Sequence, residues 1–215
     1  YTFSSSSIIN DFNEELINAY RVIQEKSSLE ELLQLLDTKY EHRIGNKDFY
    51  LETRASEYPN KIIESTARFI FLNKTCFNGL YRVNSKGKFN VPMGKFSSRP
   101  TLYNSDIIWG CHKKLQNTDI LCGDYKLLKE KIKKNDIVYL DPPYVPISPT
   151  SSFTQYTKLD FTFEDQRELK LFCDSIHEKG AKFILNNSDH PELRNLYNNP
   201  NYTIDDDINI ARSVG

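Results

Sequence analysis

Residues 136–144 read Asp-Ile-Val-Tyr-Leu-Asp-Pro-Pro-Tyr, and the interpretation of the whole chain starts from this stretch. The run at 137–140 is apolar without alternation, which is typical of a strand buried on both faces of a parallel sheet. The prolines end the strand because proline has no N–H for a sheet ladder. Asp141 is therefore predicted at the carboxyl end of a central strand, where open α/β sheets bind their ligands.

The same stretch suggests a chemistry. Asp141 offers a carboxylate that only accepts hydrogen bonds, and the Pro142 carbonyl is a second acceptor beside it. Two adjacent acceptors suit an amino group with two N–H bonds, and Tyr144 adds a flat face on which a nucleobase could stack. The alternative is a rigid turn whose Asp141 caps the next segment. The buried strand predicted in front of it favours the functional interpretation.

Length and composition narrow the class of protein. The chain has 215 residues, 39% of them hydrophobic, and a formal net charge of −1, so global charge does not indicate a nucleic-acid partner. The four cysteines are far apart and the histidines stand in no ligand spacing, so no metal site is expected. Scattered cysteines fit a reducing cytoplasm, and neither a membrane span nor a signal peptide is visible.

Two acidic residues follow short predicted strands. Residues 8–11 form one strand, and Asn13 could cap a helix over residues 14–26. Asp11 at this strand end could hold ribose hydroxyls, or it could be a helix-entry residue, and this feature alone does not decide. Residues 120–125 end in Gly-Asp-Tyr, which resembles a second nucleotide-facing strand end at Asp124.

A basic hairpin is predicted in the middle of the chain. Residues 81–84 and 88–91 flank a Ser-Lys-Gly turn. Between residues 68 and 104 there are seven Lys or Arg and no Asp or Glu. Basic residues interleaved with aromatic and Asn side chains favour a nucleic-acid surface, although an ordinary solvated basic face is the alternative.

The remaining pattern alternates helices and strands. Helices are predicted at 29–40, 59–73, 105–115, 163–179 and 191–198, a strand at 182–187 and a further strand at 202–211, while 42–58 resists assignment. The loop at 145–158 could be a lid over the site or a surface loop.

In this order the strand ends, hairpin and tetrapeptide resemble the Dam-type DNA adenine-N6 methyltransferases that keep their recognition region between the cofactor half and the catalytic tetrapeptide. The specific motifs are Phe-Asn-Gly-Leu-Tyr-Arg-Val-Asn at 77–84 and Phe-Asn-Val-Pro-Met-Gly at 89–94. The resemblance covers most of the chain. The tetrapeptide alone is shared with other amino methyltransferases, including some that act on RNA.

The resemblance implies an α/β fold, with a doubly wound, Rossmann-like methyltransferase sheet and an inserted small helical DNA-recognition domain that carries the β-hairpin. Residues 1–37 and 118–215 would form the catalytic domain that binds S-adenosylmethionine, and residues 38–117 the recognition domain. The implied reaction is methyl transfer to adenine N6 in double-stranded DNA, in the sequence GATC, after base flipping.

The resemblance also implies roles for individual residues. Asp141 and Pro142 would hold the adenine amine, and Tyr144 would stack on the base. The cofactor would be bound by Asp11, Asp124, Tyr125 and Asp141. Phe77 and Asn78 would lie at the displaced base pair, and Leu80, Arg82 and Pro92 would read bases, an Arg being suited to guanine. Asn84 and Lys95 are further expected DNA contacts.

Family segments at both ends have no counterpart here. A Gly-rich cofactor loop and a lysine-bearing segment would precede Tyr1, and final segments would follow residue 213. A polypeptide of only these residues is therefore expected to bind cofactor poorly and to be inactive. The resemblance implies a cytoplasmic protein from a prokaryote or phage, and it leaves open a cognate restriction endonuclease without a stable complex. The alternatives are an RNA base amino-methyltransferase, which leaves the hairpin unexplained, and a non-catalytic DNA-binding relative.

Overall fold

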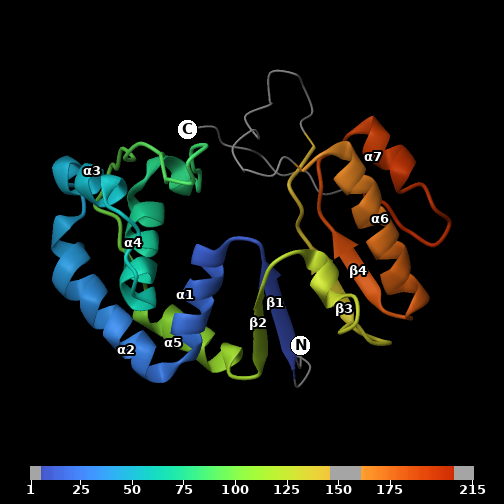
Figure 1. The fold of residues 1–215 in the computed structure, drawn as a ribbon, viewed down its shortest axis with the longest axis horizontal. Helices are drawn as coiled ribbons and strands as arrows, with labels where there is room; N and C mark the ends of the chain where they lie inside the picture. Colours follow the sequence, from blue (N-terminus) through green and yellow to red (C-terminus); the bar gives the residue numbers. More distant parts are fainter. Residues whose placement is uncertain (1–5, 146–160, 206–215) are drawn as a thin grey trace. The chain divides into compact units, whose positions relative to one another are not determined.

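The computed structural model describes residues 6–145 and 161–205 and has a mixed α/β architecture with parallel strands (Figure 1). Contacts divide the chain into two compact units. The first unit comprises Tyr1–Val83 and Lys88–Tyr125, and the second comprises Asn84–Gly87 and Lys126–Gly215. Among the described helices, none is long and apolar enough to cross a membrane.

The first unit contains a parallel strand pair. Strand β1 (Ser7–Asp11) pairs with β2 (Thr118–Cys122), and the register places Asp11 opposite Cys122. Strand β1 lies where the sequence predicts it, whereas β2 begins two residues before the predicted strand and ends at Cys122, before Gly123 and Asp124. Helix α1 (Glu14–Gln24) follows β1, and the Asn13 side chain accepts from two N–H groups of its first turn, as predicted.

Four further helices complete the first unit: α2 (Lys26–Leu35), α3 (Lys47–Ala55), α4 (Ile62–Thr75) and α5 (Ser105–Leu115). Helices α1, α2 and α4 pack against one another (Figure 1). A shared core of aliphatic and aromatic side chains holds them with the hairpin; it includes Leu32, Tyr40, Tyr50, Phe71, Leu72, Phe89 and Val91.

In the first unit, α4 begins at Ile62 rather than at residue 59, and two further segments differ from the sequence predictions. Helix α2 begins at Lys26 rather than at residue 29, because the Glu25 side chain caps it, and a π-helical turn, Leu36–Tyr40, continues it. Helix α3 lies in the segment that had no assignment. Its buried face is small, with Tyr50 and Thr53 inward, so its apolar periodicity is weak.

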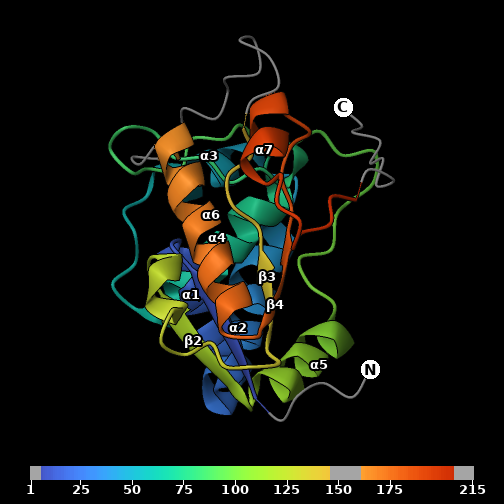
Figure 2. The ribbon, with the colours of Figure 1, turned by 90° about the vertical axis from the view of Figure 1, so that its right-hand side faces the viewer.

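The second unit has its own parallel pair. Strand β3 (Ile137–Leu140) pairs with β4 (Lys182–Leu185), and helix α6 (Phe163–Glu178) packs along β4 (Figure 2). A short helix, α7 (Pro191–Leu196), follows. The four α6 side chains predicted to point inward are buried: Leu169, Phe172, Cys173 and Ile176.

The prediction that β3 is buried on both faces is wrong. Ile137 is 72% exposed and Tyr139 61% exposed, whereas Leu140 is buried. Among the described residues β3 pairs only with β4, so alternate side chains face outward. Residues 202–205 form no strand; the rest of the strand predicted at 202–211, and the lid predicted at 145–158 beyond residue 145, lie outside the described residues.

Candidate active site and nucleic-acid interface

The tetrapeptide 141–144 follows β3 directly, so Asp141 lies at the carboxyl end of a parallel strand, as predicted. Asp141 is exposed, Pro142 is half-buried, and Tyr144 is 37% exposed. An accessible carboxylate, a neighbouring carbonyl and an accessible ring therefore occur within four residues. These are the groups that the proposed amine-binding chemistry requires.

Two amide side chains hold this turn, of which Gln166 is buried and Asn187 half-buried. Gln166 of α6, with no exposed surface, donates from Nε2 to the Pro143 carbonyl at 3.2 Å. Asn187 donates from Nδ2 to Gln166 Oε1 at 3.2 Å, and its Oδ1 accepts from the Val145 N–H at 3.2 Å. Both peptide groups that flank Tyr144 are thus bound to one amide pair, which limits the directions in which the ring can point.

Ser188 adds to this arrangement, because its Oγ donates to the Val145 carbonyl at 2.6 Å. Sequence reasoning did not identify Gln166, Asn187 or Ser188. One signal was present: Gln166 stands three residues before Leu169 on the inward stripe of α6, and a buried amide in an apolar stripe needs partners.

The predicted cofactor residues of the first unit meet at two adjacent strand ends. The Gly123 N–H donates to the Asp11 carbonyl at 3.0 Å, and Asn10 Nδ2 donates to the Gly123 carbonyl at 2.9 Å. Gly123 has a φ of 144°, a conformation that side-chain-bearing residues rarely adopt, and it turns the chain toward Asp124 and Tyr125.

These strand ends fit the nucleoside half of S-adenosylmethionine. Asp11 and Asp124 are carboxylates, which accept from hydroxyl and amine donors, and Tyr125 supplies an aromatic face. Asp11 Oδ1 already accepts from the Asn13 N–H at 2.7 Å, which orients the carboxylate. The Asn10 side-chain oxygen is buried without a hydrogen-bond partner beside this edge.

The predicted hairpin is present but is not a regular ladder. Two isolated antiparallel bridges, Val83 with Phe89 and Cys76 with Met93, join its arms. Arg82 Nε donates to Asn90 Oδ1 at 2.7 Å, and the Asn90 N–H donates to the Arg82 carbonyl at 3.1 Å. Asn90 therefore orients the guanidinium group predicted to read guanine.

A tight turn precedes the hairpin. The 3₁₀ turn Phe77–Gly79 places Asn78 at φ 52°, a left-handed conformation that Asn tolerates better than most residues. Asn73 Nδ2 donates to the Gly79 carbonyl at 3.0 Å and holds the turn. The predicted DNA contacts other than the half-buried Arg82 are exposed: Phe77, Asn78, Leu80, Asn84, Pro92 and Lys95.

The basic surface is smaller than the sequence suggests. Arg68 is only 2% exposed and points into the core, so it is no DNA contact. Five of the other basic residues between 68 and 104 are exposed, namely Lys74, Lys86, Lys88, Lys95 and Arg99. The segment itself contains no acidic residue, but Arg99 pairs with Glu41 from another part of the chain.

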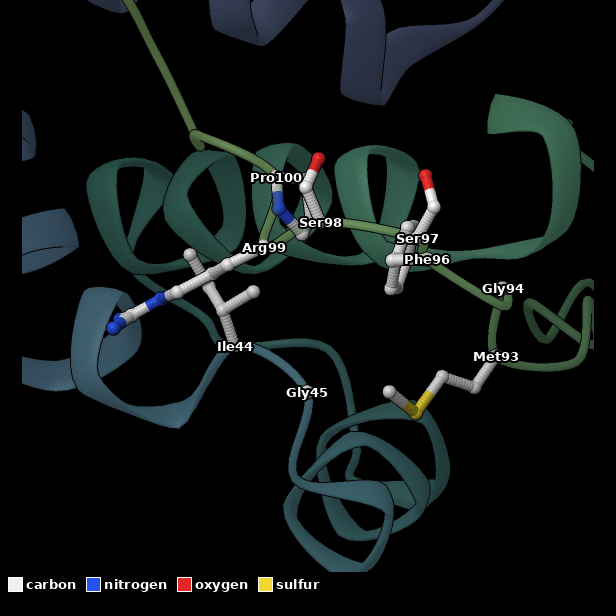
Figure 3. Close-up of a pocket in the computed structure, with 9 residues that line it drawn as sticks. All are labelled: Ile44, Gly45, Met93, Gly94, Phe96, Ser97, Ser98, Arg99 and Pro100. Atoms are coloured by element: carbon white, nitrogen blue, oxygen red, sulfur yellow. The ribbon is translucent and has the colours of Figure 1, made fainter.

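Two pockets border the end of the hairpin. One of about 370 Å³ has Ile44 and Gly45 on one wall and the segment from Met93 to Pro100 on the other (Figure 3). A second, of about 520 Å³, lies between α3 and the segment from Pro92 to Lys95. The second includes two predicted DNA contacts, and neither pocket is lined by a predicted catalytic or cofactor residue.

No cluster among residues 6–145 and 161–205 could hold a metal ion through three or more His, Cys, Asp or Glu side chains. At the strand ends, Asp11 Oδ1 accepts from a backbone N–H and the Pro143 carbonyl accepts from the Gln166 amide.

Comparison with known proteins agrees with this arrangement. Residues 4–208 match the family described as D12 class N6 adenine-specific DNA methyltransferase. The chain belongs to this family. The match includes both strand ends, the hairpin and the tetrapeptide, and it confirms the resemblance seen in the sequence.

Individual relatives are similar over most of the chain. The type II methyltransferase M.MjaIII of Methanocaldococcus jannaschii is 43% identical over 84% of this chain and 65% of its own length. The type II methyltransferase M1.LlaDCHI of Lactococcus lactis subsp. cremoris is 39% identical over 89% of this chain and 68% of its own length. The DNA adenine methylase of Escherichia coli K12 is 28% identical over 98% and 73%, respectively. The chain thus spans about two thirds of the length of these relatives.

Proposed function

We propose that the whole protein is a site-specific DNA methyltransferase that transfers a methyl group from S-adenosylmethionine to adenine N6 in duplex DNA. The observation that carries the proposal is the turn at 141–144, which directly follows a parallel strand and is held by the amide side chains of Gln166 and Asn187. Membership of the D12 family supports the reaction type.

The turn supplies the groups that would activate the amine. The Asp141 carboxylate and the Pro142 carbonyl would each accept one N–H of the exocyclic amine, which favours a lone pair localised on N6. Tyr144 would stack on the base once it leaves the helix, because the amine is closed to in-line attack within the stack. Bound S-adenosylmethionine would supply the methyl group.

The strand ends of the first unit would hold the cofactor. The Asp11 carboxylate would accept from ribose hydroxyls, and Asp124 and Tyr125 would flank the cofactor's adenine; Asp141 would also contact the cofactor. In the full protein, residues 1–37 and 118–215 would form the doubly wound catalytic domain and residues 38–117 the recognition domain.

The hairpin would read the target, for which we propose the sequence GATC. Arg82, oriented by Asn90, suits guanine O6 and N7 in the major groove. Leu80 and Pro92 would contact neighbouring bases, and the exposed turn carrying Phe77 and Asn78 would lie at the displaced pair. Asn84 and Lys95 would contact DNA at its backbone.

The test uses the full-length protein, tritiated S-adenosylmethionine, and two matched duplexes that contain GATC or GTAC. We expect label only in the GATC duplex, recovered as N6-methyladenine. Label in both duplexes would keep the reaction and remove the site assignment. An absence of label with DNA binding intact would contradict the reaction and favour an RNA substrate or a non-catalytic relative.

Two variants assign the roles. Asp141→Ala should abolish methylation and leave DNA binding in place, and equal loss of both would indicate a structural role. Arg82→Ala should cost about 1–3 kcal/mol for the cognate site and relax discrimination at one guanine. Unchanged site preference would remove Arg82 from the readout.

A further inference from the structure

Tyr81 of the hairpin forms a hydrogen bond with helix α1, which follows strand β1. The Tyr81 hydroxyl donates to Glu15 Oε2 at 2.7 Å, and the Asn13 side chain also interacts with this hydroxyl. Asn13 in turn caps α1 and donates its N–H to Asp11. Tyr81 is therefore joined to the short segment that connects β1 to α1.

The acceptor of this bond is the largely buried carboxyl group of Glu15. The Glu15 side chain is 16% exposed, and its Oε1 lies 3.8 Å from the guanidinium of Arg68, without a hydrogen-bond partner. Burial raises the pKa of Glu15, and the Tyr81 hydroxyl and the Arg68 charge oppose that shift. A carboxylate in this environment accepts a strong hydrogen bond from a hydroxyl group, because the charge on the acceptor strengthens the bond.

Arg68 keeps the carboxylate in place. Its Nε donates to the Thr53 carbonyl at 3.0 Å, and a second nitrogen donates to the Arg54 carbonyl at 3.2 Å. The guanidinium also lies over the Tyr58 ring at 4.6 Å. With the cation held by α3 and by Tyr58, the position of Glu15 is set from two sides.

Tyr81 stands between two residues proposed to read bases, Leu80 and Arg82. Side chains alternate along an extended chain, so a Tyr81 ring turned toward Glu15 directs its two neighbours to the opposite face. The Tyr81 ring packs at 5.8 Å from Phe69 and 5.9 Å from Phe89, which a phenylalanine would preserve. The hydroxyl is thus separable from the packing of the ring.

We propose that Tyr81 and Glu15 are positioning residues for target discrimination: their hydrogen bond fixes the position and orientation of the hairpin arm that carries Leu80 and Arg82. The proposal rests on the proposed function of the hairpin. The opposite arm is held separately, because the Val91 carbonyl accepts from the Tyr50 hydroxyl at 2.9 Å and from Arg54 at 3.1 Å. Loss of the Tyr81 bond therefore removes a side-chain anchor from one arm, while the other arm keeps its own anchor at Val91.

The experiment compares Tyr81→Phe with Tyr103→Phe in the full-length protein. Tyr103 is a matched control because its hydroxyl also donates to a carboxylate of the same unit, Asp37, at 2.7 Å, and neither residue belongs to a hairpin arm. The first measured quantity is the dissociation constant of a duplex with one guanine replaced, divided by the dissociation constant of the GATC duplex. The second is kcat/KM for methylation of the GATC duplex, divided by kcat/KM for the replaced duplex, so that both ratios rise with discrimination.

We expect Tyr81→Phe to lower both ratios about tenfold, the usual effect of losing a charge-assisted hydrogen bond. Tyr103→Phe should leave both ratios unchanged. Glu15→Gln, which keeps an oxygen acceptor for Tyr81, should retain most of the discrimination, whereas Glu15→Ala should lose it. Thermal unfolding establishes that each variant is folded.

Unchanged ratios in Tyr81→Phe, or an equal loss in Tyr103→Phe, would overturn the proposal. If the unmodified protein binds GATC selectively but methylates nothing, the proposed reaction fails while the binding ratio still tests Tyr81. If it shows no selectivity for any guanine-containing site, the hairpin assignment and this inference fail together, and methylation of both duplexes leaves the reaction standing.

Discussion

The catalytic turn and the base-reading hairpin are both irregular segments held by buried polar side chains, but the chemistry of the two supports differs. Neutral amides hold the turn, since Gln166 and Asn187 bond to each other and to the backbone on both sides of Tyr144. An ion pair supports the hairpin, through Glu15 and Arg68.

This difference predicts how each segment responds to pH and to mutation. Amides do not titrate and cost less to bury than charges, so the geometry of the turn should be constant with pH. Charges in a buried pair depend on one another, and removal of one leaves the other uncompensated. The hairpin support is therefore the more vulnerable of the two to mutation and pH.

The largest effect is expected at Arg68. Arg68→Met keeps the apolar stem but leaves Glu15 buried without its cation, and two carbonyls lose their donor. We expect a loss of about 3–5 kcal/mol in the free energy of unfolding, measured by urea denaturation. The control is Lys170→Met, which breaks the half-buried pair with Asp174 and should cost about 1 kcal/mol or less. Equal losses would show that burial of the pair is unimportant.

A smaller effect is expected at the amide pair. Gln166→Met removes one donor and one acceptor at similar volume, so the Pro143 carbonyl and Asn187 Nδ2 lose a partner. The expected loss is about 1–3 kcal/mol, with a fall in kcat and little change in DNA affinity. Gln34→Met, at an exposed position of α2, serves as the control and should change neither. A fall in DNA affinity equal to the fall in kcat would contradict a role confined to the turn.

The pH dependence of stability separates the two supports further. Because burial raises the folded-state pKa of Glu15, its contribution to stability is present below its unfolded-state pKa and is lost as pH rises through the folded-state pKa. The slope is at most about 1.4 kcal/mol per pH unit. We expect plots of the free energy of unfolding against pH to differ in slope by up to this amount between the protein and Glu15→Gln. Parallel plots would contradict the assignment.

Asp174 should contribute a pH dependence of stability of the opposite sign. Burial acts to raise its pKa, but bonds from Lys170 and Tyr202 outweigh burial and lower it. Its contribution is therefore present above its unfolded-state pKa and is lost as pH falls through the folded-state pKa. Asp174→Asn should accordingly flatten the acid side of the curve, where Glu15→Gln steepens it.

The smallest effect is expected at an exposed pair of residues that is joined by hydrogen bonds at the start of α6. Thr162 and Asp165 form a capping box at the start of α6, and the Thr162 hydroxyl lowers the pKa of Asp165. Thr162→Ala should cost about 1 kcal/mol, measured by denaturation, while Thr162→Ser should cost less. A loss as large as that of Arg68→Met would remove the ranking by burial.

The local sequence pattern alone was enough to predict many of the helices, the strand ends and the family. Short apolar runs stopped by polar or proline residues predict the end of β1 at Asp11 and the ends of β2 and β3 shortly before Asp124 and Asp141. Apolar periodicity predicts α5 and α6. The hairpin motif and the tetrapeptide were enough to identify the family, because their chemistry is written in consecutive residues.

Tertiary structure decided what supports those segments. Arg68 stood in a basic run in the sequence, yet it is buried because Glu15, 53 positions away, compensates its charge. Gln166 lies 23 positions from Pro143, and Asn187 lies 42 positions from Val145. Strand β3 is exposed on one face although its composition predicted burial on both. Burial and pairing depend on which distant segments meet in space, and local periodicity carries no information about those meetings.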